Sequence, residues 1–402
     1  MTNTPLKDVV SSQYARWMYP EPIVDLPAWL ANNWQWFDPS HAHRLLWPDQ
    51  DYRAGLDILI AGCGTNQAAV IAFTNPGAKV VAIDVSQHSL DHQRFLKDKY
   101  GLKNLELHLL PIEEVQSLGR DFDLIISTGV LHHMASPQAG MNALAPCLRQ
   151  NGVIAIMLYA RYGRIGVDIM QSVFRDMELT QDEASVAKVK EVLSLLGPEH
   201  PIRSYMALAP DLGYDAGLVD TFLHGRERNY TIPECIELVT TAGLVFQDMF
   251  FKAPYLPWPF ANNTLNASLS HMDREQQWSI MERLNFRNGC HFFTACRSDR
   301  PLNTYQIDFS NSKATAYVPS FRYRCALQGD QLSRLDWRMN LEANPLVLVQ
   351  LIDGKRSIQD IAKLAAQTPP WSGQTEQAIA LSAVAFFKAL WQIDVLAMGL
   401  SS

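Results

Sequence analysis

The sequence has no long uninterrupted apolar run. A helix needs roughly 18 or more consecutive apolar residues to cross a bilayer, so we expect no membrane span. The first residues also lack the basic stretch followed by an apolar stretch that marks a secretory signal. We therefore expect a cytoplasmic protein.

Cysteine pairs of the C-x-x-C type are absent, and the six cysteines are scattered along the chain. This pattern favours reduced thiols over disulfides or a zinc site, and we expect no resident metal. An excess of positive charge is absent too, because the formal net charge is -7. A chain of this charge is not expected to carry a broad nucleic-acid surface.

The 402 residues are too many for a single hydrophobic core, so two or three domains are expected. The first part, residues 1–52, is rich in tryptophan, tyrosine and proline but poor in basic residues. Aromatic side chains can anchor a protein at a membrane surface, but they usually do so together with lysine and arginine. We therefore expect this segment to pack over a folded domain.

Strand-like and helix-like patterns alternate between residues 54 and 160. Segments such as 67–73 and 89–99 are predicted to be helices. This alternation predicts right-handed crossovers and a parallel sheet with helices on both faces. The strands are expected at 57–61, 79–84, 105–110, 122–127 and 152–159.

The strand at 57–61 runs into the turn Gly62-Cys63-Gly64, and Asp84 ends the next strand. Glycine lets a ligand approach the backbone, and a carboxylate at a strand end can bind a ribose diol. This pair predicts a nucleotide-type cofactor at the carboxyl ends of the strands. A nicotinamide cofactor is disfavoured, because Asn66 and Gln67 interrupt the G-x-G-x-x-G spacing of dehydrogenases. The alternative for Asp84 is a helix N-cap.

Two inserts interrupt the alternation of strands and helices. The first, at 161–230, is helical, and Thr180 to Glu183 forms a capping-box pattern within it. The second, at 252–290, contains a predicted helix at 273–284. Residues 304–402 form a separate small, mainly helical unit, in which Ser357 is the expected N-cap of a helix. Further elements are a helix at 232–242, strands at 244–251 and 291–297, and a helix at 376–390.

Four ordered segments resemble the motifs of class I S-adenosylmethionine-dependent methyltransferases, namely Leu59–Thr65, Ala82–Ser86, Phe122–Ile125 and Thr128–Met134. The resemblance implies an α/β fold, in which a doubly wound, seven-stranded Rossmann-like sheet carries the helical inserts. The methyltransferase domain would span 53–303. The segments around Tyr19–Pro22 and Tyr159–Arg164 are similar to a bacterial subgroup with such inserts. The C-terminal Leu351–Ile358 is similar to winged-helix or PqqD-like modules.

The resemblance implies S-adenosylmethionine as the cofactor. Three positions depart from the family pattern: Ile60 and Pro111 stand where acids usually bind the methionine amino group and the adenine, and Asn66 replaces a third glycine. Backbone at Ile112 and the carboxylate of Glu113 or Glu114 are expected to substitute for the second acid. The expected cofactor contacts are Gly62, Cys63, Gly64, Asp84, Val85, Ile112, Glu113, Thr128 and Gly129.

Methyl transfer to a hydroxyl or an ammonium group needs a base that takes the proton. His132 and His133 follow the fourth strand, beside the expected methyl position, and Tyr162 follows the fifth. These three residues are the catalytic candidates. The alternative for the histidines is a packing or helix-capping role.

Five residues are candidates for acceptor binding. Arg161 and Arg164 carry guanidinium groups suited to a carboxylate or phosphate, with a salt bridge at a helix entry as the alternative. Asp220 and His224 lie one helical turn apart and are compatible with a base dyad, half a metal site or a surface pair. Tyr19, in the aromatic N-terminal segment, completes the set.

The sequence thus predicts S-adenosylmethionine-dependent methyl transfer by in-line displacement. The helical insert favours a closed pocket, and therefore a small-molecule acceptor. Two alternatives stay open: a peptide or protein acceptor recruited through the C-terminal domain, and a regulatory protein that binds the cofactor without catalysis. No nucleic-acid partner is expected.

Overall fold

The computed structural model describes residues 13, 16–261 and 264–400, which form two compact units. The sheet unit contains the described residues up to 35 together with 54–248 and 282–299. The C-terminal unit contains 36–53, 249–281 and 300–400. Both units are therefore discontinuous in sequence, whereas the sequence pattern predicted the contiguous parts 1–52, 53–303 and 304–402.

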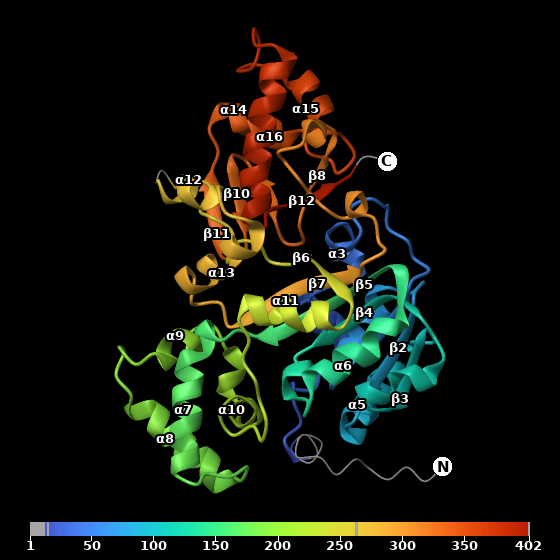
Figure 1. Ribbon diagram of the computed structural model, residues 1–402, viewed down its shortest axis with the longest axis vertical. Helices are drawn as coiled ribbons and strands as arrows, with labels where there is room; N and C mark the ends of the chain where they lie inside the picture. The colour runs from blue at the N-terminus through green and yellow to red at the C-terminus, as the bar shows by residue number, and fades with distance from the viewer. Residues whose placement is uncertain (1–12, 14–15, 262–263, 401–402) are drawn as a thin grey trace. The chain divides into compact units, whose positions relative to one another are not determined.

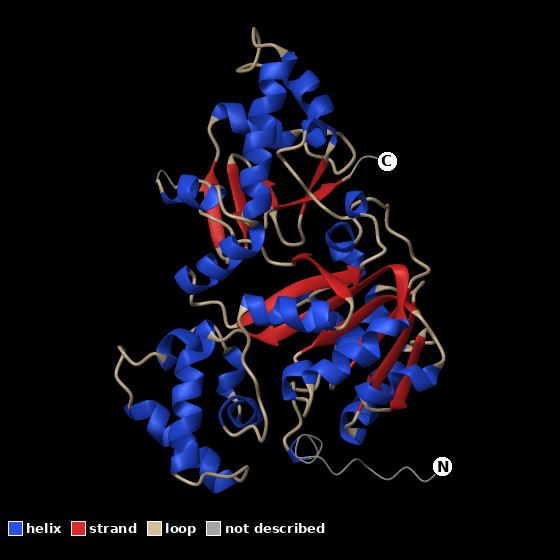
Figure 2. Ribbon diagram, in the orientation of Figure 1, coloured by secondary structure: helices blue, strands red, loops and turns tan. Residues whose placement is uncertain are grey.

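The sheet unit is built on the predicted seven-stranded sheet, with the strand order β3-β2-β1-β4-β5-β7-β6. Its strands are drawn in red in Figure 2. Strands β1 to β5 pair in parallel, and β7 pairs antiparallel with β5. The doubly wound α/β fold is thus confirmed. The strands are β1 Asp57–Ala61, β2 Lys79–Asp84, β3 Leu105–Leu109, β4 Phe122–Thr128, β5 Leu148–Tyr159, β6 Leu244–Met249 and β7 Cys290–Arg297.

Apolar strands form the centre of this unit, and Ile58, Leu59 and Ile60 of β1 are fully buried. Burial on both faces explains why these strands are continuous apolar runs rather than alternating ones. The helices α5, α6 and α11 lie along the sheet in Figure 1. The helices that accompany the strands are α2 Leu26–Asn32, α4 Gln67–Thr74, α5 Gln87–Tyr100, α6 Pro137–Leu144 and α11 Ile232–Thr241, with short 3-10 turns η1 Ile112–Leu118, η2 Leu131–His133 and η3 Ala145–Cys147.

The predicted helical insert forms a cap with its own apolar core, which includes Val167, Phe174 and Val189. One detail of the prediction is wrong: the helix begins at Glu183 because Asp182, not Thr180, accepts the backbone N–H of Ser185 at 2.8 Å. The cap consists of η4 Tyr162–Arg164, α7 Ile165–Asp176, α8 Glu183–Leu195, α9 Ile202–Met206, η5 Pro210–Gly213 and α10 Asp215–Phe222.

The C-terminal unit packs three helices around a second apolar core that includes Ile361, Ile379 and Phe387. Ser357 is the N-cap of α15, as predicted, and forms a capping box with Asp360. A winged-helix identity for this unit stays a prediction. Its elements are α3 Pro39–Leu46, α12 Leu265–Ser270, the start of α13 Arg274–Leu284, η6 Leu302–Thr304, η7 Ser312–Ala316, β8 Val318–Phe321, β9 Ala326–Gln328, β10 Gln331–Arg334, β11 Trp337–Asn340, α14 Ala343–Gln350, α15 Ile358–Ala365, α16 Glu376–Gln392 and β12 Leu396–Gly399.

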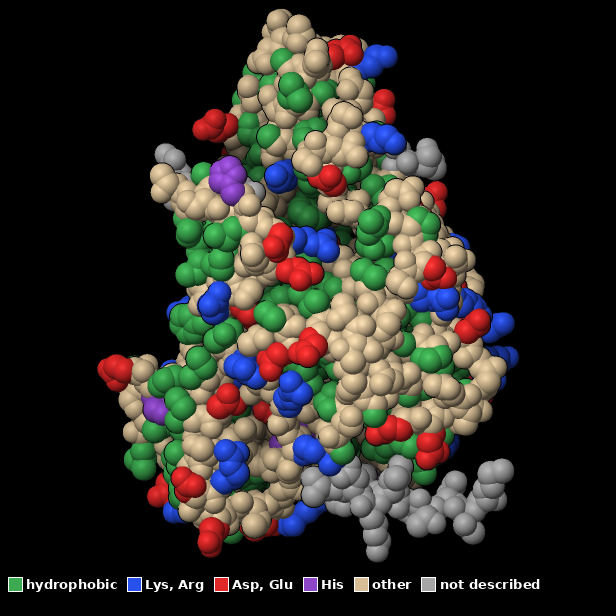
Figure 3. All heavy atoms as spheres, in the orientation of Figure 1, with side chains coloured by type: hydrophobic (Ala, Val, Ile, Leu, Met, Phe, Trp, Pro, Cys, Tyr) green, Lys and Arg blue, Asp and Glu red, His purple; other side chains and the backbone are tan. Residues whose placement is uncertain are grey.

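Two surface properties bear on the expected partners. Among the helices formed by the described residues, none combines the length and the apolar character needed to cross a membrane. On the face drawn in Figure 3, acidic and basic side chains are interspersed rather than gathered into separate regions.

Candidate functional site

The turn after β1 adopts a backbone that only glycine tolerates well. Gly62 has φ +80° and Gly64 has φ +53°. A Cβ atom on Gly62 would clash with Cγ2 of Val130, so close packing also favours glycine at this position. The backbone N–H groups of Gly62 and Cys63 both donate to the carbonyl of Ile83, which ties the turn to the end of β2.

Asp84 ends β2 and is buried beneath this turn. Its Oδ2 accepts the N–H of Gly64 and its Oδ1 accepts the N–H of Ser86, each at 2.8 Å. Burial raises the pKa of Asp84, and the backbone donors oppose that rise. The hydroxyl of Ser86 caps α5, so the N-cap role does not fall to Asp84. The N–H of Val85 and the thiol of Cys63 also form hydrogen bonds to this carboxylate, so donors of the turn and of the next loop converge on Asp84.

The other expected cofactor residues lie at the same edge of the sheet, since the parallel strands all end there. Thr128 ends β4, and its hydroxyl accepts a hydrogen bond from Nε2 of Gln67 at 3.2 Å. Gly129 follows with φ +74°. Ile112 and Glu113 begin the 3-10 turn after β3, with Ile112 buried and Glu113 exposed. Val85 follows Asp84 directly.

His132 lies in η2 beyond β4 and is 1% exposed. Its ring stacks on Tyr159 with centroids 3.9 Å apart, and its Nδ1 accepts the backbone N–H of Tyr159 at 3.3 Å. A neutral imidazole that accepts at Nδ1 carries its proton on Nε2. Burial, with Arg164 and His224 nearby, holds the pKa of His132 well below its usual value. His132 is therefore a neutral hydrogen-bond donor.

His133 has the opposite tautomer. Its Nδ1 lies 3.0 Å from the carbonyl oxygen of Arg226, and a carbonyl can only accept, so Nδ1 carries the proton. The lone pair is then on Nε2. Burial, followed by the neighbouring His132 and His224, holds the pKa of His133 well below its usual value. Of the two histidines, His133 is the one whose Nε2 can accept a proton.

Asp220 and His224 of the cap come close to His133, and one side-chain donor atom of each of the three residues lies within 4.8 Å of the others. The rings of His133 and His224 nevertheless stack face to face, 3.8 Å apart and 20° from parallel. In-plane lone pairs of nearly parallel rings do not meet at one point. His224 also accepts the N–H of Arg226 at Nδ1, which places its proton on Nε2. This arrangement does not fit a single metal ion.

The two arginines predicted to bind an acidic acceptor are engaged elsewhere. Arg164 is fully buried and donates to Glu227 at 2.8 Å and to the hydroxyl of Tyr205 at 2.6 Å. Arg161 is exposed and pairs with Glu234 at 2.9 Å. The alternative, a salt bridge at a helix entry, thus describes both side chains. Tyr162 is half-buried at the start of η4, and among the described residues it forms no hydrogen bond or ring contact with His132 or His133.

Several contacts within this buried cluster were not predicted from the sequence. Tyr159 lies between the ring of His132 and the guanidinium of Arg164, whose Cζ is 3.7 Å from the tyrosine ring centroid. Its hydroxyl donates to Asp220 at 3.4 Å. Tyr19, which was predicted, donates its hydroxyl to Asp211 at 2.9 Å. These contacts join segments up to 192 positions apart, and no local motif signals them.

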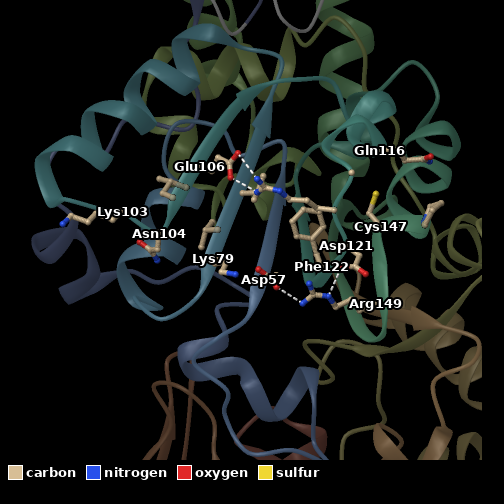
Figure 4. Close-up of a pocket in the computed structure, with 16 residues that line it drawn as sticks. Asp57, Lys79, Lys103, Asn104, Glu106, Gln116, Asp121, Phe122, Cys147 and Arg149 are labelled. Atoms are coloured by element: carbon tan, nitrogen blue, oxygen red, sulfur yellow. Dashed lines mark hydrogen bonds and ion pairs between the residues drawn. The ribbon is translucent and has the colours of Figure 1, made fainter.

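A cleft of about 890 Å³ lies at the opposite, amino-terminal edge of the sheet. Figure 4 shows Asp57, Lys79 and Arg149 around it, at or near the beginnings of β1, β2 and β5. Arg149 is paired there with Asp57, Asp121 and Asp123. Ligands of open α/β sheets bind at the carboxyl ends of the strands, so this cleft is on the wrong edge for a cofactor.

Comparison with known sequences identifies the domain. A profile of the methyltransferase domain family matches residues 53–199. An uncharacterized protein of Synechococcus sp. is 27% identical over 329 residues, which cover 79% of this chain and 77% of that protein. The malonyl-acyl-carrier protein O-methyltransferase of Acetivibrio thermocellus is 30% identical over 112 residues, which cover 28% of this chain and 38% of that enzyme.

Comparison with solved structures extends the likeness of fold beyond the sheet. PKMT2 from Rickettsia typhi, solved in complex with AdoHcy, superposes with a TM-score of 0.66 at 14% identity, covering 91% of this chain and 76% of that chain. The sheet order, the glycine turn with Asp84, and the family match agree with one another. Residues 53–199 match the methyltransferase domain family, and this match, the fold and the related sequences support S-adenosylmethionine-dependent methyltransferase activity.

Proposed function

We propose that this methyltransferase acts on a small metabolite bound beneath the helical cap, and that the acceptor carries a hydroxyl or an amino group. S-adenosylmethionine would supply the methyl group from its sulfonium sulfur, and that sulfur would leave as a neutral thioether. The observation that carries the proposal is the burial of His133, Tyr159 and Asp220 where β4, β5 and the cap meet. Buried polar groups at the carboxyl edge, covered by an insert, favour an enclosed pocket.

The cofactor half of the site rests on backbone and one carboxylate. The turn Gly62-Cys63-Gly64 would approach the cofactor closely, and Asp84 would accept hydrogen bonds from the ribose hydroxyls. Ile112 and Glu113, after β3, would face the adenine. Thr128 and Gly129 would border the methyl group, where a larger side chain at position 129 would obstruct the acceptor.

The acceptor half needs a group that takes a proton. In this role we place His133, because its Nε2 has the lone pair while its Nδ1 is fixed by the carbonyl of Arg226. When the nucleophile bonds to the methyl carbon, its proton passes to Nε2 of His133. His132, with the proton on Nε2, would instead donate a hydrogen bond to the acceptor and orient it.

The proposal is tested by incubating the protein with cofactor labelled in its methyl group and a native lysate from the source organism. The products are then separated by size before the label is counted. We expect label in the small-molecule fraction. Label confined to protein or peptide would contradict the small-metabolite acceptor and support the peptide alternative, and label that disappears on nuclease treatment would indicate RNA.

A further inference from the structure

The segment Tyr19–Ile23, which we name the strap, lies directly on the glycine turn. Cδ of Pro20 is 3.3 Å from the position that a Cβ atom would take on Gly64, and the carbonyl oxygen of Tyr19 is 4.0 Å from it. The hydroxyl of Thr65 donates to the carbonyl of Pro20 at 2.8 Å. The strap therefore packs directly against the glycine turn.

Asn66 holds the strap through both ends of its amide. Its Nδ2 donates to the carbonyl of Glu21 at 2.8 Å, and its Oδ1 accepts the N–H of Ile23 at 2.9 Å. The residue is 4% exposed, so both bonds are shielded from water. Asn66 stands at the position where the family pattern has a third glycine, and a glycine could make neither bond. This departure thus has a structural role.

The two ends of the strap are fixed to different elements. At one end Tyr19 donates to Asp211 of the cap, and its ring stacks on Tyr214 with centroids 6.4 Å apart. At the other end the carbonyl of Ile23 bonds to Nε2 of His92 in α5 at 2.9 Å. The strap therefore connects the cofactor turn with the cap that covers the acceptor side.

We propose that Asn66 is a positioning residue for the cofactor, because it keeps the strap closed over the turn Gly62-Cys63-Gly64. The inference rests on the proposed cofactor site. A segment that lies over a binding turn must open before the ligand leaves, so its anchoring bonds slow dissociation. The same segment excludes water from the turn and links occupancy of the turn to the cap through Tyr19.

The test measures the dissociation rate of S-adenosylhomocysteine by stopped-flow fluorescence in the wild type and in Asn66→Gly. This variant removes both amide bonds and restores the usual glycine. Loss of two buried hydrogen bonds predicts dissociation about tenfold to a hundredfold faster. Hydrogen exchange should also become faster in residues 19–24 and stay unchanged in β4. A matched control is Asn33→Gly, because within the described part of the chain the side chain of Asn33 donates to the nearby carbonyl of Trp29 and does not bond to the strap.

The outcomes separate this inference from the proposed function. The inference would be overturned if Asn66→Gly released S-adenosylhomocysteine at the wild-type rate and its strap kept the wild-type rate of hydrogen exchange. That result would not affect the proposed cofactor site. Failure of the folded wild type to bind S-adenosylhomocysteine would overturn both. If Asn66→Gly does not fold, Thr65→Val removes one strap bond and should still speed dissociation severalfold; a wild-type rate in that folded variant would contradict the role of the strap.

Discussion

The two halves of the site are built in different ways. The proposed cofactor half uses strand ends, glycine backbone and Asp84, all within about 70 residues of sequence. The acceptor half uses buried and half-buried side chains from the strap, η2, β5 and the cap, which are far apart in the chain. The first half can bind a common cofactor with few specific side chains, whereas the second half can differ widely between relatives. Changes in the two halves should therefore have separable effects.

The largest effect is expected from Asp84→Ala. The variant removes the carboxylate proposed to bind the ribose and also the acceptor of the Gly64 N–H. We expect the affinity for S-adenosylhomocysteine to fall at least about a hundredfold, because two charge-assisted hydrogen bonds and the shape of the turn are lost together. Calorimetry measures this, with Asp91→Ala on the exposed face of α5 as the control. If folded Asp84→Ala bound S-adenosylhomocysteine with wild-type affinity, Asp84 would not belong to the cofactor site.

The second effect separates binding from transfer. His133→Gln should lower the rate of methyl transfer by about 10² to 10⁴, the usual contribution of a general base, while the affinity for S-adenosylhomocysteine stays within about threefold. Label transfer to the small-molecule fraction measures the rate, and His108→Gln on β3 is the control. If His133→Gln lost cofactor affinity instead, the histidine would belong to the cofactor half and the division would fail.

The third effect concerns the scaffold of the acceptor half. Glu227 is the charged partner of Arg164, and both side chains are almost fully buried. Removal of one charge from such a pair costs about 3 to 5 kcal/mol, so Glu227→Gln should lower the melting temperature clearly. Glu191→Gln, which changes an exposed pair with Lys188, should not. An unchanged melting temperature in Glu227→Gln would show that the pair contributes little to the cap.

The smallest effect tests the titration of Glu282, which lies outside both the cofactor half and the acceptor half of the site. Burial raises the pKa of Glu282 to about 7, and its carboxylate accepts the N–H of Ile232 at the start of α11. The folded state then binds this proton more tightly than the unfolded state, so stability falls as the pH rises from about 4.5 to about 7. Glu282→Gln should remove that fall and stabilise the protein at pH 8 by about 2 to 3 kcal/mol at most.

Thermal melting from pH 5 to pH 8 measures the difference between Glu282→Gln and the wild type. His291 lies 3.7 Å from Glu282 and has its pKa lowered to about 4 by burial, so it adds stability as the pH rises to about 6.5. His291 is present in both proteins, so its contribution largely cancels in the comparison. A difference that did not grow with pH would contradict the raised pKa of Glu282.

Sequence alone predicted the sheet and the glycine turn after β1, because periodic apolar strands and glycine turns are local signals. Asp84, for example, is marked by its place at a strand end, and the structure puts it beneath the turn. The internal pairing of Arg164 with Glu227 depends on the fold of the cap, and no spacing along the chain encodes it. The two hydrogen bonds between the side chain of Asn66 and the strap were not predicted for the same reason, since each spans more than 40 residues of sequence.

A crystal structure with S-adenosylhomocysteine tests the central claim most directly. The account predicts density for the ligand at the carboxyl edge of the sheet, against the turn Gly62-Cys63-Gly64 and the carboxylate of Asp84. Density confined to the opposite edge, in the cleft bordered by Asp57, Lys79 and Arg149, would contradict it.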